Sequence, residues 1–363
     1  MSKKPLILFI LSAGAAMLAA LWAGLIRLGW TLPVLSTNLA SAHGPLMVSG
    51  FLGTLVTLER AVALRKRWMY AAPALTGGGS LALLAFPENG LGYILLTLGS
   101  LLGVGILVEI VRRETQLHSL TMLVGSVSWF LGNLAWSLGQ PIFQVVWTWQ
   151  AFLVLTIAGE RLELSRVLRP TRMVKALFVA AGFIYLLGVG TAQFNLEWGA
   201  RAGGLGMILL AAWLIKYDLA LRNLRHRIPL TRYIATCLSI GFVWLGVSGL
   251  LNLYAGATNG GPLYDAALHG VFVGFVISMI FGHAPIIFPA ILGVPIQYKE
   301  IFYLHLALLH VSLFIRLAGD LAGSLAARQW GGLLNEAALI LFVAMTIVSL
   351  RQAKSKNPAA TLR

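Results

Sequence analysis

Long apolar runs, separated by short polar connectors, follow one another along nearly the whole chain. Apolar residues do not alternate with polar ones at every second position, so the runs predict α-helices and not the strands of a barrel. A helix of about 20 residues crosses a hydrocarbon core of ~30 Å. We predict twelve membrane-spanning helices, at residues 5–30, 39–64, 69–87, 89–112, 117–137, 141–168, 172–193, 199–221, 231–256, 264–290, 300–319 and 331–351.

Composition supports an all-α polytopic membrane protein. Of the 363 residues, 58% are hydrophobic and 11% are charged, whereas a water-soluble chain carries about 25% charged residues. The spans leave no stretch for a soluble catalytic domain, so we expect a single transmembrane domain over residues 1–363 with a cytoplasmic tail at 352–363. The lone cysteine, Cys237, excludes an internal disulfide and a CxxCH haem attachment.

The net charge of +15 is unevenly distributed between the two predicted faces. Cationic loops stay in the cytoplasm during insertion, which predicts a multi-pass protein of the bacterial inner membrane with both termini cytoplasmic. Short basic loops between spans suit contact with membrane lipids and not with nucleic acid. With this orientation, the following Lys and Arg residues alone face outward: Arg27, Arg201, Arg316 and Arg328.

A weak internal repeat suggests three four-helix units around a pseudo-threefold axis. The related segments lie in the second, sixth and tenth predicted spans, four spans apart. They read His43-Gly44 with Gly50-Phe51, Gly159-Glu160-Arg161, and His269-Gly270 with Gly274-Phe275.

His43 and His269 are the strongest candidates for cofactor binding. Both enter their spans from the outer side at nearly equal depth, and two imidazoles from facing helices are what a bis-His haem requires. Each is followed by a glycine, which we interpret as room for a flat ligand close to the backbone. The alternative is that each histidine binds a neighbouring carbonyl or lines a wet cavity.

Three further histidines lie in the last third of the chain. His283 faces the same side of its helix as His269, about 21 Å away at ~1.5 Å per residue. His283 with His305 or His310 is a candidate for copper or a second haem; proton conduction or a structural role is the alternative. We expect Pro285 and Pro289, which follow His283, to interrupt the backbone hydrogen-bond ladder and free carbonyls, an irregularity that usually lines a cavity or a site.

Charged residues near span ends complete the candidates. Glu59-Arg60 and Glu160-Arg161 are interpreted as anchors of helix depth, with a cross ion pair, a proton entry point or a propionate clamp as alternatives. Arg316 lies near the outer end of its span, where its guanidinium would suit haem propionates; the simpler account is an ion pair with Asp320, four residues on.

These residues resemble the NnrS family of haem- and copper-containing membrane proteins and, more distantly, haem-copper oxidase subunit I. The resemblance implies His43 and His269 as ligands of a low-spin haem b, and a role in electron transfer or in nitric oxide and nitrosative-stress chemistry. The sixth and seventh spans contain no His, and the tenth lacks His-x-His. An oxygen-reducing centre like that of the oxidases is therefore not expected.

We therefore predict a haem-binding membrane protein. Such a protein could act as an oxidoreductase, with a redox partner or within a respiratory complex. Two other classes remain open. One is a proton-coupled secondary transporter, with a substrate site at a broken helix. The other is a non-catalytic membrane subunit of a respiratory complex.

Overall fold

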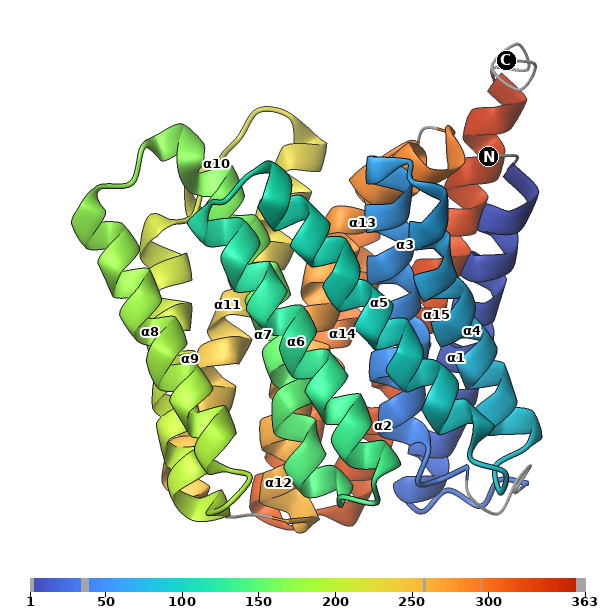
Figure 1. The fold of residues 1–363 in the computed structure, drawn as a ribbon, viewed down its shortest axis with the longest axis vertical. Coiled ribbons are helices and arrows are strands. Elements are labelled where there is room, and N and C mark those ends of the chain that lie inside the picture. Colours follow the sequence, from blue (N-terminus) through green and yellow to red (C-terminus); the bar gives the residue numbers. More distant parts are fainter. Residues whose placement is uncertain (1–2, 34–38, 257–258, 295, 357–363) are drawn as a thin grey trace. The chain divides into compact units, whose positions relative to one another are not determined.

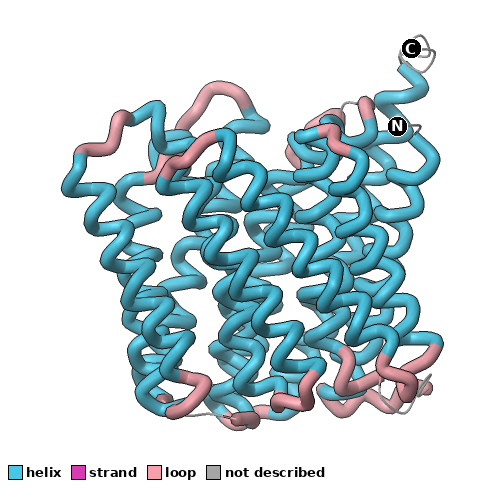
Figure 2. The backbone as a smooth tube through the Cα atoms, viewed as in Figure 1, coloured by secondary structure: helices cyan, strands magenta, loops and turns pink. Residues whose placement is uncertain are grey.

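The computed structural model describes residues 3–33, 39–256, 259–294 and 296–356, and every element within them is a helix (Figure 2). The chain divides into two compact units, Met1–Glu160 and Arg161–Arg363. The arrangement of three four-helix units stays a prediction. Residues 357–363, the end of the predicted tail, lie outside the described residues.

In the first unit, successive helices reverse direction at each loop (Figure 1). The helix α1 packs against the second span and α4, and α5 lies between α4 and α6. The last helix, α7, continues into the second unit. The elements are α1 (Lys3–Arg27), α2 (His43–Pro45), η1 (Leu46–Leu52), α3 (Gly53–Leu64), η2 (Arg67–Tyr70), α4 (Ala71–Ala85), α5 (Leu91–Arg113), α6 (Leu117–Ser137) and α7 (Ile142–Leu164).

In the second unit, α9 packs between α8 and α11, while α14 packs along α15 and contacts α12 (Figure 1). The elements are η3 (Ser165–Leu168), α8 (Arg172–Thr191), α9 (Leu196–Tyr217), α10 (Ala220–Asn223), α11 (Pro229–Ala255), α12 (Gly261–His269), η4 (Gly270–Ile277), α13 (Ser278–Leu292), α14 (Phe302–Ala322) and α15 (Leu325–Lys356).

Among the described residues, ten helices are long and apolar enough to span a membrane, as in a multi-pass membrane protein. Large apolar side chains lie exposed along them: Phe183 is 65% exposed and Phe314 67%. Such exposure is unfavourable in water and favourable in lipid. The other two predicted spans also hold helices, α4 with 15 residues and α6 with 21. Neither is among the ten, so the twelve-span count stays a prediction.

Small residues set the contact between α8 and α9. A Cβ atom added to Gly188 would lie 2.0 Å from the Gly203 backbone N, and one added to Gly206 would lie 2.4 Å from the Tyr185 Cα. The two backbones therefore touch at positions where any larger residue would separate them. Close approach of this kind is the usual source of helix association in lipid, where apolar burial gives little net gain.

A buried polar network joins three helical elements of the first unit. The Ser49 hydroxyl donates to Asn133 Oδ1 over 2.7 Å, the Trp129 indole N–H donates to Ser49 Oγ over 2.9 Å, and the Trp149 indole N–H donates to Asn133 Oδ1 over 3.0 Å. All four residues are buried. Because a buried polar group without a partner is costly, this network fixes η1 against α6 and α7.

Two of the described segments are π-helical, Leu46–Leu52 and Gly270–Ile277. This geometry is rare and often occurs at functional sites. The helix α13 continues through Pro285 and Pro289 and ends at Leu292. Each proline lacks a backbone N–H and so omits one hydrogen bond of the helix. The next residue, Gly293, has a φ of 66°, a left-handed conformation that glycine adopts without strain. The irregular backbone lies before the prolines, in η4.

Candidate functional site

His269 is the last residue of α12 and directly precedes the π-helix η4. Its Nδ1 donates to the carbonyl oxygen of Asp265, one turn earlier, over 2.8 Å. The Asp265 Oδ1 atom lies 3.3 Å from the same nitrogen. A proton on Nδ1 leaves the lone pair of the neutral ring on Nε2, the tautomer that metal-bound histidines commonly use.

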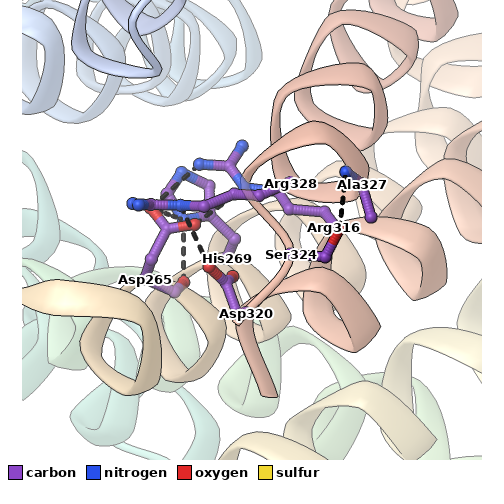
Figure 3. Close-up of polar contacts among 7 residues, drawn as sticks. All are labelled: Asp265, His269, Arg316, Asp320, Ser324, Ala327 and Arg328. Atoms are coloured by element: carbon purple, nitrogen blue, oxygen red, sulfur yellow. Dashed lines mark hydrogen bonds and ion pairs between the residues drawn. The ribbon is translucent and has the colours of Figure 1, made fainter. Parts of the chain in front are cut away.

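Asp265 is the centre of a group of charged side chains from α12, α14 and α15, which we call the Asp265 cluster (Figure 3). The Arg316 guanidinium donates twice to its carboxylate, from Nε over 2.8 Å and from Nη2 over 2.9 Å. The Arg328 Nη2 atom lies 3.6 Å from Asp265 Oδ1, and its Nε lies 2.9 Å from Asp320 Oδ1. The cluster comprises Asp265, His269, Arg316, Asp320 and Arg328.

The cluster corrects the expected pair of Arg316 with Asp320 on one helix. Arg316 instead pairs with Asp265 on α12, and Asp320 pairs with Arg328 on α15. The Asp265 and Arg316 side chains are 13% and 9% exposed. Two buried opposite charges in fork geometry compensate each other. Two of the five N–H bonds of Arg316 are therefore committed to Asp265, which leaves the remaining ones for any propionate.

His43 is the first residue of α2 and lies three residues before the π-helix η1. Its Nδ1 donates to the carbonyl oxygen of Ala20 on α1 over 2.7 Å. The half-buried ring is therefore in the same tautomer as that of His269, although its partner is on a neighbouring helix. His43 belongs to the first unit and His269 to the second.

The glycines after these histidines differ in their surroundings. A Cβ atom on Gly44 would make an ordinary contact with the Trp149 ring at 3.6 Å, whereas one on Gly270 would lie 2.1 Å from Ser248 Oγ. The space beside Gly270 is thus filled by a side chain of a neighbouring helix, which makes helix packing its role. Room for a flat ligand beside Gly44 stays a prediction.

The other three candidate histidines differ from one another in hydrogen bonding. His283 donates from Nδ1 to the Met279 carbonyl over 2.7 Å, which repeats the tautomer of His43 and His269. His310 accepts from the Trp244 indole at Nδ1 over 3.0 Å, and its Nε2 lies 3.4 Å from Ser278 Oγ. Both nitrogens of His310 are engaged, so a metal would have to displace one of these partners.

His305 is completely buried, and its Nε2 lies 2.9 Å from the Tyr233 hydroxyl. Within the described parts of the chain, no three or more His, Cys, Asp and Glu side chains gather closely enough to hold a metal ion. A site with two histidine ligands has fewer ligating side chains than such a group, so this observation does not bear on it.

The acidic and basic pairs at the ends of α3 and α7 form ion pairs. Arg60 pairs with Glu160, one of the alternatives that the sequence left open. Arg161 pairs instead with Asp218, from Nε over 2.9 Å and from Nη2 over 2.8 Å, and is 5% exposed. A buried fork of this kind is not snorkelling, so that interpretation is wrong for Arg161.

Sequence reasoning missed Asp265, Arg328 and Tyr233. Asp265 was detectable, because it lies one helical turn before His269 and would be an acidic group within a predicted span. Arg328 and Tyr233 had no such signal, because their partners lie on other helices. The two π-helices also had no signal in the sequence, because no residue pattern predicts them.

The model of a domain of unknown function (DUF8744) matches residues 6–351, and the chain belongs to this family. The match includes every candidate residue above. No curated protein matches the sequence.

Proposed function

We propose that this member of the DUF8744 family binds haem b within the membrane, with His43 and His269 as the axial ligands. Bound haem would supply reversible one-electron transfer. The proposed role is electron transfer or nitric oxide chemistry, in line with the resemblance to the NnrS family. We place the protein in the bacterial inner membrane with twelve spans and cytoplasmic termini, on the basis of its charge distribution.

One observation carries the proposal: both histidines donate Nδ1–H to a backbone carbonyl, over 2.7 Å for His43 and 2.8 Å for His269. Each ring is thereby held in the tautomer whose Nε2 bears the lone pair. Hydrogen bonding of the other nitrogen to a carbonyl or carboxylate is a recurrent feature of metal-binding histidines, since it fixes the ring and raises its basicity. The adjacent π-helices support the same interpretation.

The Asp265 cluster would tune the His269 ligand. A carboxylate 3.3 Å from Nδ1 would polarise the Nδ1–H bond and so strengthen electron donation from Nε2. Arg316 compensates the Asp265 charge in its buried position. The same residues thus orient and polarise the ring without contacting the iron.

The proposal does not extend to copper. Of the histidines first considered for it, His310 has hydrogen-bond partners at both nitrogens, and His305 is paired with a phenol. The transporter alternative lacks its expected feature, because α13 continues through both prolines. No observation on the described residues favours the non-catalytic subunit over haem binding.

The test is an optical spectrum of the detergent-purified protein from haem-replete cells. We expect a reduced-minus-oxidised haem b spectrum and about one haem per chain, as two axial ligands imply. His43→Ala and His269→Ala should each abolish it. The matched control is His226→Ala, in the loop after α10, which should leave the spectrum unchanged.

Two outcomes would refute the proposal. A colourless wild-type preparation would exclude haem binding altogether. Loss of the spectrum in His283→Ala with retention in His43→Ala would show that the ligand pair is wrong, because His283 has the same tautomer.

A further inference from the structure

Tyr233 on α11 and His305 on α14 form a pair in the second unit that the proposed haem site does not use. The phenol oxygen lies 2.9 Å from His305 Nε2, and both residues are completely buried. Nε2 accepts from the phenol when the imidazole carries its own proton on Nδ1. A buried phenol thus has a base within proton-transfer distance.

Three phenylalanines surround the His305 ring. The ring centroids of Phe281, Phe342 and Phe302 lie 4.7, 5.3 and 5.6 Å from that of His305, and Phe281 is perpendicular to it at 86°. The Nδ1 atom is buried and has no hydrogen-bond partner. The surroundings of the ring are therefore apolar, and the Tyr233 hydroxyl is the hydrogen-bond partner that they leave to it among the described residues.

We propose that Tyr233 and His305 are a redox-active pair, in which Tyr233 gives up one electron while its phenol proton moves to His305 Nε2. The electron passes to a one-electron oxidant, the O–H bond breaks, and an N–H bond forms. The products are a neutral tyrosyl radical, an imidazolium and the reduced oxidant. Only one unit of positive charge appears in the pair, and it lies on the ring that the phenylalanines surround.

Proton transfer is the reason for assigning this role to Tyr233 and not to another tyrosine. Loss of an electron without loss of the proton would leave a phenol cation radical, a far stronger acid than an imidazolium. Oxidation is therefore much easier where a base within hydrogen-bond distance takes the proton. Tyr185 on α8 is completely buried and its hydroxyl has no partner. It therefore has no base to accept its proton and serves as the matched control.

Tyr298 offers a path for the electron. It lies outside the predicted spans, half-buried, with its ring centroid 5.5 Å from that of Tyr233. Its hydroxyl has no partner, and burial raises the pKa of this phenol to about 12, so it keeps its proton at neutral pH. The Tyr298 ring thus links the Tyr233 ring to the end of the helices without competing for the proton.

The experiment is oxidation of the full-length protein in detergent by hexachloroiridate(IV), followed by electron paramagnetic resonance. We expect a tyrosyl signal that Tyr233→Phe removes and Tyr185→Phe retains. Electron–nuclear double resonance should detect an exchangeable deuteron hydrogen-bonded to the radical oxygen after transfer into D2O. His305→Gln should remove that coupling and slow radical formation by about 100-fold, as for loss of a positioned base.

The result that would overturn the proposal is a buried tyrosyl signal with equal yield in Tyr233→Phe and wild type, or none in wild type. A rate unchanged by His305→Gln, in a variant whose thermal unfolding matches wild type, would equally overturn it. If His305→Gln does not fold, the deuteron coupling in wild type decides: its absence refutes the proton transfer. The haem proposal is tested separately, because it depends on the haem spectrum.

Discussion

Asp265→Asn removes the charge at the centre of the Asp265 cluster while nearly preserving the shape of the side chain. In the wild-type protein the carboxylate accepts both hydrogen bonds of the Arg316 fork, at 2.8 and 2.9 Å, and lies 3.6 Å from Arg328. Because Arg316 is 9% exposed, its charge would remain without compensation. Breaking a buried pair in this way costs about 3–5 kcal/mol.

The free energy of unfolding is measured by denaturant titration of tryptophan fluorescence in detergent. Asp320→Asn is the control, because the ion pair of Asp320 is with Arg328, which is less buried than Arg316. We expect it to cost about 1.5 kcal/mol, the loss of one charge-assisted contact. Where haem is bound, Asp265→Asn should also make the oxidised haem less stable relative to the reduced haem, because the carboxylate beside His269 is lost.

A double-mutant cycle with Arg316→Gln isolates the pair. The double variant should be more stable than the sum of the single losses implies, by about 2 kcal/mol, since removal of both partners leaves no buried charge alone. Additive losses within about 0.5 kcal/mol would refute the reasoning. A loss below about 1 kcal/mol in Asp265→Asn itself would show that water reaches Arg316 and replaces the carboxylate.

Three further predictions concern the packing of the helices. Gly188→Ala should destabilise the protein by about 1–3 kcal/mol, because the α9 backbone occupies the place of the added methyl group. The control is Gly190→Ala on the same helix, where a Cβ atom would have no neighbour within 4 Å. This variant should be neutral or slightly stabilising in thermal unfolding. Asp218→Asn should cost about 3 kcal/mol in a denaturant titration, since the buried Arg161 would lose its carboxylate; a loss near zero would contradict the buried fork. Asn133→Leu should cost about 1–3 kcal/mol, because the Trp149 indole and the Ser49 hydroxyl lose their acceptor and the Leu96 carbonyl loses a donor. Unchanged thermal stability would count against the network.

The candidate site was only partly predictable. His43 and His269 stand out in the sequence because an ionisable group within an apolar span needs a reason. The contacts of their rings were not predictable, because one carbonyl belongs to α1 and the other to the same helix. The pair of Arg316 with Asp320 was the natural expectation from spacing four along a helix. Asp265 displaces it because an adjacent helix presents a carboxylate in the better fork geometry.

The Gly270 position shows the same limit. A glycine in a sequence indicates that a side chain is missing, but the sequence does not name the neighbour that fills the volume. At Gly270 that neighbour is Ser248 on another helix. The sequence alone therefore does not distinguish a glycine that accommodates a ligand from one that accommodates a packed side chain.

By itself, the sequence determined the helical, membrane-type character of the chain, most helix positions and the two histidines worth testing. These features depend on the order of residues along one helix, where apolar length and local spacing act directly. Tertiary structure alone decided that Asp265 holds Arg316, that Tyr233 meets His305 and that two segments wind as π-helices. Such contacts depend on the rotation and depth of one helix against another, which packing sets and the period of a single helix does not encode.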